Sequence, residues 1–252
     1  MIPNDSLKLA KSTMKKLENP KKHAPPFLKR KWQEWRYTLL FVVFVLVPVK
    51  SSLADWNWVP TGSMNPTILE GDLVYVNKLA YDLRFPLTLH SLKHQADPER
   101  GDITVLFSPE DRTRMVKRVI GLPGDKIEMR NNIVTINGKQ IDYLALSSDQ
   151  TKDLEAELHG ISIFAEEQLD GRPHSVMSIP SIQTPLRNFR KITVPEDQYF
   201  VMGDNRDVSK DSRIFGFAER KLFVGEATGV IASFNILDKF QPRLRRFFTK
   251  LQ

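Results

Sequence analysis

The hydrophobic pattern of the chain has one outstanding feature, an apolar run in its first quarter. Residues 37–49 read YTLLFVVFVLVPV, and Lys50, Ser51 and Ser52 then interrupt the run. A helix needs about 20 residues to span a bilayer. A span over residues 37–54 therefore requires the Lys50 side chain to snorkel toward the lipid head groups. With that condition, the pattern predicts a transmembrane anchor over 37–54.

The residues around this run predict how the anchor lies in a membrane. Trp32 and Trp35 precede it, and Trp56 and Trp58 follow it, as is typical of side chains at a lipid–water interface. Residues 1–36 hold ten basic and three acidic side chains, so this basic tail alone accounts for the net charge of +7. By the positive-inside rule we expect a single-pass membrane protein with a cytoplasmic N-terminus and an exported C-terminal domain.

Two other interpretations of the apolar run remain open on pattern alone. Ser52-Leu53-Ala54 could be the cleavage site of a removable signal peptide, and so short a run could also be a buried core helix. The polar stretch before the run is long for a signal peptide. We therefore expect a retained anchor.

The rest of the chain is predicted to be mostly β. Its β-branched and aromatic residues occur in short runs bounded by turn residues, at 73–79, 102–107, 114–122, 126–130, 133–137, 197–203 and 227–234. The pairs Asn131-Asn132 and Asn137-Gly138 indicate tight hairpin turns. One stretch, 147–160, has weak helical character.

The exported domain, expected over residues 55–252, has two parts that differ from the rest. Residues 131–195 are irregular, contain several prolines and indicate a smaller β-rich insert. In the segment 240–252, apolar side chains recur at helical spacing with basic side chains between them. This basic amphipathic segment is compatible with lying on anionic lipid, and equally with packing on the protein.

Composition and motifs disfavour several kinds of chemistry. The absence of cysteine excludes disulfides, thiol nucleophiles and cysteine metal sites. Charges balance outside the basic tail, so a nucleic-acid-binding domain is disfavoured. The sequence has no HExxH zinc motif, and GLPGDKI lacks the ending of a phosphate-binding loop. None of the five histidines stands in a pattern typical of a Ser-His-Asp triad.

A serine in a proline-framed turn follows the apolar run directly. Ser63 lies in WNWVPTGSMNPTILEGD, residues 56–72. As a nucleophile it would need a base, and a lysine can serve if burial lowers its pKa. In RMVKRVIGL, strand alternation places Lys117 on one face with Met115 and Val119, where loss of hydration favours the neutral amine. An ordinary turn and an ion-paired lysine remain open on pattern alone.

Three sequence blocks, taken together, resemble one known family. They are PTGSMNPTILEGD, VKRVIGLPGDKI and YFVMGDNRDVSKDSRIFGF, in this order after the apolar run. This order resembles the type I signal peptidases, membrane-anchored Ser/Lys endopeptidases that remove signal peptides from exported proteins. The resemblance covers about residues 37–79, 101–138 and 194–234, whereas the basic tail and residues 139–193 match little.

The resemblance implies catalytic roles for the residues that match the family's motifs. Ser63 is similar to the nucleophile, and Lys117 to the general base that takes its proton. Ser209 resembles the serine that hydrogen-bonds the lysine amine and orients it. Thr61 stands where the family commonly has a serine whose hydroxyl helps the Ser63 N–H to stabilise the oxyanion.

The resemblance also implies supporting contacts. Arg118 with Asp204, and Asp211 with Arg213, resemble charge pairs that hold the lysine strand against the GDNRD turn, although ordinary surface pairs remain open. Met64 is similar to a residue near the pocket for the small residue before the cleaved bond.

The function implied by the resemblance is cleavage of signal peptides after small residues, at Ala-X-Ala-like sites. The implied partners are signal-peptide-bearing preproteins and membrane lipid, with no nucleic acid, metal or organic cofactor. Val208 and Phe215 depart from the family's usual residues, but neither is a proposed catalytic residue.

Two alternatives to this function stay open. One is a dedicated Ser/Lys peptidase that matures a pilin or conjugation protein, and the other is an inactive membrane-tethered binding or assembly protein.

Overall fold

The computed structural model describes residues 26–85, 88, 90–146, 156–236 and 238–251. The chain divides into two units, Met1–Val47 and Pro48–Gln252. Most of the basic tail, residues 1–25, and the first part of the predicted helical stretch, residues 147–155, lie outside the described residues.

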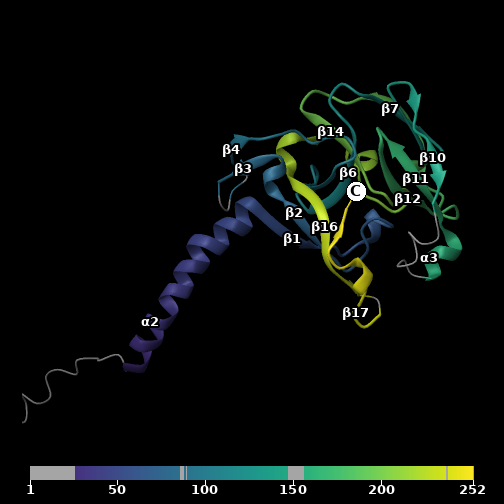
Figure 1. Cartoon of the computed structure of the whole chain (residues 1–252). Helices are drawn as coiled ribbons and strands as arrows, with labels where there is room; N and C mark the ends of the chain where they lie inside the picture. The colour runs from purple at the N-terminus through teal and green to yellow at the C-terminus, as the bar shows by residue number, and fades with distance from the viewer. Residues whose placement is uncertain (1–25, 86–87, 89, 147–155, 237, 252) are drawn as a thin grey trace, which may run out of the picture. The chain divides into compact units, whose positions relative to one another are not determined.

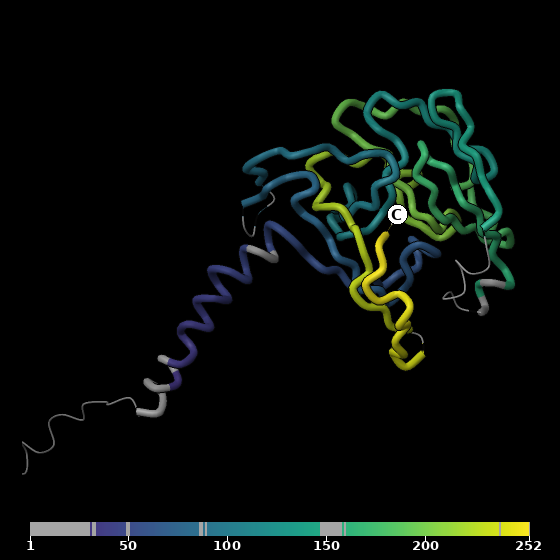
Figure 2. Tube along the Cα trace, in the orientation of Figure 1, coloured from purple at the N-terminus to yellow at the C-terminus, as the bar shows by residue number. Residues whose placement is uncertain are grey.

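The described part of the first unit is helical. Helix α2 (Pro26–Phe41) continues into the π-helical turn η1 (Val42–Leu46), as Figure 2 shows. From Trp35 to Leu46 the large apolar side chains are exposed; Phe44, for example, is 72% exposed. Among the described residues, Glu34–Leu53 is the one helix whose length and composition suit a membrane span, and it overlaps the predicted anchor.

A large antiparallel sheet forms the centre of the second unit. Its strands follow the order β1-β2-β16-β5-β6-β14-β15, and β17 (Gln241–Pro242) and β18 (Thr249–Lys250) also pair with β16. The strands of the main path are β1 (Ala54–Trp58), β2 (Asp72–Asn77), β16 (Phe223–Asn235), β5 (Ile103–Phe107), β6 (Arg114–Gly121), β14 (Gln198–Met202) and β15 (Ala218–Glu219). The predicted mostly β fold is confirmed. Strand β1 was not predicted, because its two tryptophans were interpreted as residues at a membrane interface.

Three smaller sheets complete the second unit. Figure 1 shows β10, β11 and β12 side by side with helix α3 beneath them. The sheets are β13-β7-β8-β9 (Phe189–Thr193, Lys126–Arg130, Ile133–Ile136, Lys139–Gln140), β10-β11-β12 (Tyr143–Ala145, Ile163–Leu169, Arg172–Ser178) and β3-β4 (Asp82–Arg84, Ser91–His94). The short helices are α3 (Ala156–Ile161) and α4 (Ser212–Phe215).

Both predicted hairpin turns are present. Asn131 and Asn132 have φ values of 49° and 65° and join β7 to β8, while Asn137 and Gly138, at 52° and 83°, join β8 to β9. Positive φ at both central residues is the geometry of the tight turns that match the twist of a hairpin. The sheet that results includes β7, so it extends past the insert boundary expected at residue 131.

Strand β6 contributes to two hydrophobic cores because successive side chains point to opposite faces. Val119 packs in the cluster that contains Phe223, and Ile120 packs in the cluster that contains Phe200. A third cluster, which includes Met64 and Val76, lies under the segment that carries Ser63. Lys117 is therefore attached to a buried strand, and the turn that carries Ser63 rests on a hydrophobic cluster.

The segment 240–252 does not form the helix that its spacing indicated. Its described residues form β17, one 3₁₀ turn η8 (Leu244–Arg246) and β18, and both strands pair with the edge of β16. Backbone pairing with β16 satisfies the groups that a helix would have satisfied internally. The Arg246 guanidinium contacts the Asp72 carboxylate at 2.6 Å and donates to the Thr67 carbonyl.

This arrangement predicts that Arg246→Met destabilises the full-length protein in detergent. Removing the guanidinium leaves the fully buried Asp72 carboxylate without its cation. Breaking one side of such a pair costs about 3 kcal/mol of unfolding free energy. Denaturant unfolding measures the change. The exposed neighbour Arg245→Met is the control, and equal stability of the two variants would show that the segment does not pack as described.

Candidate active site

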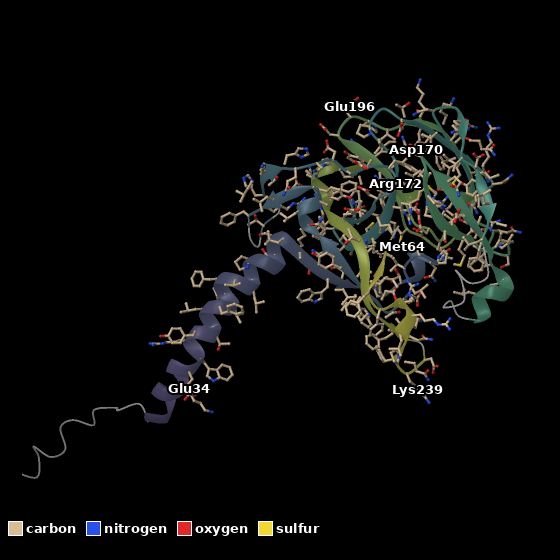
Figure 3. The ribbon with its side chains drawn as sticks, viewed as in Figure 1. Glu34, Met64, Asp170, Arg172, Glu196 and Lys239 are labelled. Carbon is tan, nitrogen blue, oxygen red and sulfur yellow. The ribbon has the colours of Figure 1, made fainter. Side chains whose placement is uncertain are left out.

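Ser63 lies in a short turn that is anchored to the hydrophobic core by its neighbour Met64. The 3₁₀ turn η3 (Gly62–Met64) follows the extended residue Thr61, and the Asn65 N–H donates to the Gly62 carbonyl at 3.1 Å. The Met64 side chain, labelled in Figure 3, is 1% exposed and belongs to the hydrophobic core. Met64 therefore holds the turn in place and does not line the cavity at Ser63.

Lys117 projects from β6 toward that turn. Its strand pairs with β5, where Lys117 lies opposite Thr104. The Lys117 side chain is buried, as the strand alternation predicts. Its Nζ lies 2.8 Å from the Ser63 Oγ and donates to the Val116 carbonyl at 2.8 Å. The two residues are 54 positions apart in the chain, and the sheet brings them into hydrogen-bond contact.

The surroundings of Lys117 make its amine a usable base. Burial lowers the pKa of Lys117 to about 8, because the charged ammonium loses its hydration. The nearby Asp211 and Asp204 carboxylates oppose this change in pKa, and Arg213 adds to it. Near neutral pH, a usable fraction of the amine is therefore unprotonated and able to accept a proton from Ser63.

Each of the two carboxylates near Lys117 is held by its own arginine. Arg118 binds Asp204 through two hydrogen bonds of 2.9 and 2.8 Å, and Arg213 binds Asp211 through two of 2.8 and 2.7 Å. All four side chains of these pairs are almost completely buried. Burial alone would raise the pKa of Asp204 and Asp211, but the arginines hold both pKa values below the usual range. The arginines therefore bind two carboxylates that would otherwise stabilise the Lys117 ammonium more strongly.

The turn after β14 reaches the backbone of Ser63. The Asn205 N–H donates to the Ser63 carbonyl, and the Asn205 side-chain amide donates to the Gly62 carbonyl, both at 3.2 Å. At Gly203, an added Cβ would lie 2.3 Å from both the Ser63 carbonyl oxygen and the Ser209 Oγ. This close approach excludes any side chain at position 203. Asn205 was visible in the GDNRD block, but sequence alone gave no sign that it binds the Ser63 backbone.

Ser209 lies close to the dyad without the expected hydrogen bond to Lys117. Its side chain is buried, and among the described residues its hydroxyl has no partner within hydrogen-bond geometry. The hydroxyl is nevertheless near enough to Asp211 to help lower the pKa of that carboxylate. The orienting role of Ser209 stays a prediction.

These residues line one cavity of about 790 Å³. Thr61, Ser63, Lys117 and Ser209 all reach it, and Thr61 is exposed at its edge. Sequence reasoning did not anticipate two further groups in the wall, because they come from distant parts of the chain. These are the insert residues Leu158, Ile179 and Leu186, and Arg243 of the segment 240–252.

The arrangement suits acyl transfer. A serine hydroxyl in contact with a buried amine can attack a carbonyl carbon while the amine takes its proton. The open cavity leaves room for an extended chain to approach Ser63.

Comparisons with known proteins identify similar chains. The model of one family, "Signal peptidase, peptidase S26", matches residues 32–232. Signal peptidase I of Rickettsia akari (strain Hartford) is 34% identical over 212 residues, which are 77% of each chain. Signal peptidase I of Rickettsia typhi (strain ATCC VR-144 / Wilmington) is 33% identical over 245 residues, covering 84% of this chain and 90% of that protein.

One solved structure is also similar. The crystal structure of a signal peptidase I from Enterococcus faecalis V583 is 30% identical in sequence. The match covers 53% of this chain and 98% of that chain, with a TM-score of 0.33.

Burial of Lys117 predicts a pH-dependent gain in stability when this lysine is removed. Between pH 8 and 10.5 the unfolded chain binds a proton at Lys117 that the folded chain does not, so the unfolding free energy rises with pH in that window. Below pH 8 the full penalty is present, about 3 kcal/mol from the difference in pKa.

We therefore expect Lys117→Met to be more stable than the unmodified protein at pH 7, by up to about 3 kcal/mol, with the difference shrinking toward pH 10.5. Denaturant unfolding at several pH values measures it, with the exposed Lys126→Met as control. A Lys117→Met protein that is less stable at pH 7 would contradict the lowered pKa.

Proposed function

Because this chain belongs to the signal peptidase family, peptidase S26, we propose that Ser63 and Lys117 remove signal peptides from exported preproteins. The observation that carries the proposal is the 2.8 Å contact between the Ser63 Oγ and the Nζ of a buried lysine. A lysine in water would be protonated and unable to act as a base near neutral pH. The burial of Lys117 removes this obstacle.

The reaction runs through an acyl-enzyme. The Ser63 Oγ attacks the carbonyl carbon of the scissile bond while the Lys117 Nζ accepts the hydroxyl proton. The tetrahedral intermediate collapses, and the Lys117 ammonium returns the proton to the departing amine nitrogen. A water molecule, deprotonated in turn by the Lys117 Nζ, then attacks the ester carbon. The ester bond breaks, and the Lys117 ammonium returns the proton to the Ser63 Oγ.

The negative charge of the tetrahedral intermediate needs hydrogen-bond donors. The Ser63 N–H and the Thr61 hydroxyl are the proposed donors, and Thr61 stands at the edge of the same cavity. One such donor contributes about 3 kcal/mol to lowering the barrier. We propose cleavage after small residues, at Ala-X-Ala-like sites, with the core residue Met64 holding the Ser63 turn in place.

The apolar helix suits an enzyme that works on membrane-bound substrates. Glu34–Leu53 is long and apolar enough to serve as a membrane anchor. An anchored enzyme and an anchored preprotein share one surface, which raises their effective concentration. We propose a single pass through the bacterial inner membrane with the basic tail in the cytoplasm and the catalytic domain outside it. No metal or organic cofactor takes part in the proposed reaction.

The dyad predicts that Ser63→Ala and Lys117→Met each abolish processing of a model preprotein by the purified protein. The rate of the unmodified enzyme should rise with pH through about 8, because only the neutral Lys117 amine accepts a proton. Circular dichroism checks that the variants are folded.

Lys78→Met is the matched control for Lys117→Met, since Lys78 is also a buried lysine but pairs with Asp55 and does not line the Ser63 cavity. Processing at the normal rate by Lys117→Met would refute the dyad.

The proposed orientation has its own test. Protease added outside spheroplasts should digest the domain after the anchor and leave the basic tail protected, as seen with antibodies against each end. Protection of the domain and digestion of the tail would reverse the topology.

A further inference from the structure

The insert makes direct backbone contact with the turn that carries Asn205. The Met177 N–H of β12 donates to the Asp204 carbonyl at 2.9 Å, and the Arg206 N–H donates to the Met177 carbonyl at 2.8 Å. Met177 and Asn205 thus form a parallel β-bridge. The turn is in effect a short extra strand on the β10-β11-β12 sheet.

A buried ion pair strengthens this junction. Glu167 of β11 accepts two hydrogen bonds from the Arg206 guanidinium, at 2.7 and 2.9 Å. The Glu167 side chain is fully buried and that of Arg206 is 2% exposed. A bidentate pair fixes both the position and the plane of the guanidinium. Arg206 therefore cannot turn without breaking two charged hydrogen bonds inside the protein.

Two more residues of the insert complete the surroundings of Glu167. The Tyr143 hydroxyl donates to the Glu167 carboxylate at 2.5 Å, and the His174 Nε2 lies 3.3 Å from its other oxygen. Burial alone would raise the pKa of Glu167, but Arg206 and His174 hold that pKa well below its usual range. The carboxylate is therefore charged near neutral pH.

The residue after Arg206 has a separate tether. Arg187 binds the Asp207 carboxylate through two hydrogen bonds of 2.9 and 2.8 Å, and the Ile179 N–H donates to the same carboxylate. The insert thus holds Asp204, Arg206 and Asp207. Between them Asn205 donates to the backbone of Gly62 and Ser63.

From this continuous path we infer that Glu167 is a positioning residue of the reaction: through Arg206 and Asn205 it holds Ser63 against Lys117 and keeps water from the Lys117 amine. The inference rests on the proposed dyad. It assigns the insert a share in building the active site. No atom of Glu167 is proposed to touch substrate.

The test compares two changes of the same chemistry on one strand. Glu167→Gln removes the buried charge that binds Arg206. Glu166→Gln is the matched control, because Glu166 is the preceding residue of β11 and its carboxylate accepts a hydrogen bond from Gln168 on the other face of the strand. Both full-length variants are purified in detergent, and kcat and KM are measured on a preprotein substrate from pH 6 to 10.

We expect Glu167→Gln to lower kcat at pH 7.5 by at least tenfold with KM changed less than twofold. We also expect the rising limb of its pH profile to move to higher pH. The groups that face Lys117 with a charge are Asp204, Asp211 and Arg213. None of them is altered, so a moved limb would report water reaching the amine. A loss of folded protein would lower the rate without moving the limb. A Glu167→Gln enzyme that matches Glu166→Gln in kcat and in the limb overturns the inference.

A double variant covers the case in which Glu167→Gln does not fold. Glu167→Gln with Arg206→Gln removes both buried charges and leaves two amides that can hydrogen-bond. We expect it to fold and to show the same reduced kcat and moved limb, because a neutral pair holds the turn less firmly. Activity and pH profile equal to those of the unmodified enzyme would overturn the inference.

The two proposals fail in different ways. The dyad fails if Lys117→Met is active, whatever Glu167 does. The positioning role fails if Glu167 is dispensable in an enzyme whose dependence on Lys117 has been established.

Discussion

The burial of one amine, that of Lys117, is the constraint on which the site depends. A lysine buried beside a free carboxylate would form an ion pair and stay protonated. Here the two nearest carboxylates, Asp204 and Asp211, are each bound by an arginine through two hydrogen bonds. The amine is left with the Ser63 hydroxyl and a backbone carbonyl. The two arginines reduce the effect of these nearby carboxylates on Lys117, so that burial still lowers the pKa of its amine.

The same constraint explains why three distant segments meet around Ser63. Strand β6 supplies the lysine, the core under Met64 fixes the serine turn, and the turn after β14 joins the two through Asn205. The insert holds the turn after β14 through the pair of Glu167 with Arg206, and the segment 240–252 binds the Thr67 carbonyl, a few residues beyond the serine turn.

Local patterns in the sequence correctly predicted the features that depend on neighbouring residues, namely the face of a strand and the position of a turn. Strand alternation placed Lys117 on a buried face, and the Asn-Asn and Asn-Gly pairs located two hairpins. The helical spacing in 240–252 was misleading, because pairing with the edge of β16 took precedence over the amphipathic pattern. The contact of Glu167 with Arg206 joins residues 39 positions apart, and no periodicity in either segment marks it. The missing hydrogen bond of Ser209 likewise depends on tertiary geometry.

Gly203 carries a consequence for the interpretation of related genomes. The backbone at this position lies so close to the Ser63 carbonyl that a single methyl group would push the two segments apart. A homologous chain could therefore retain the serine, the lysine and the anchor and still be unable to bring the first two into contact. The residue at this position therefore tells whether a related chain can bring its serine and lysine together as they lie here.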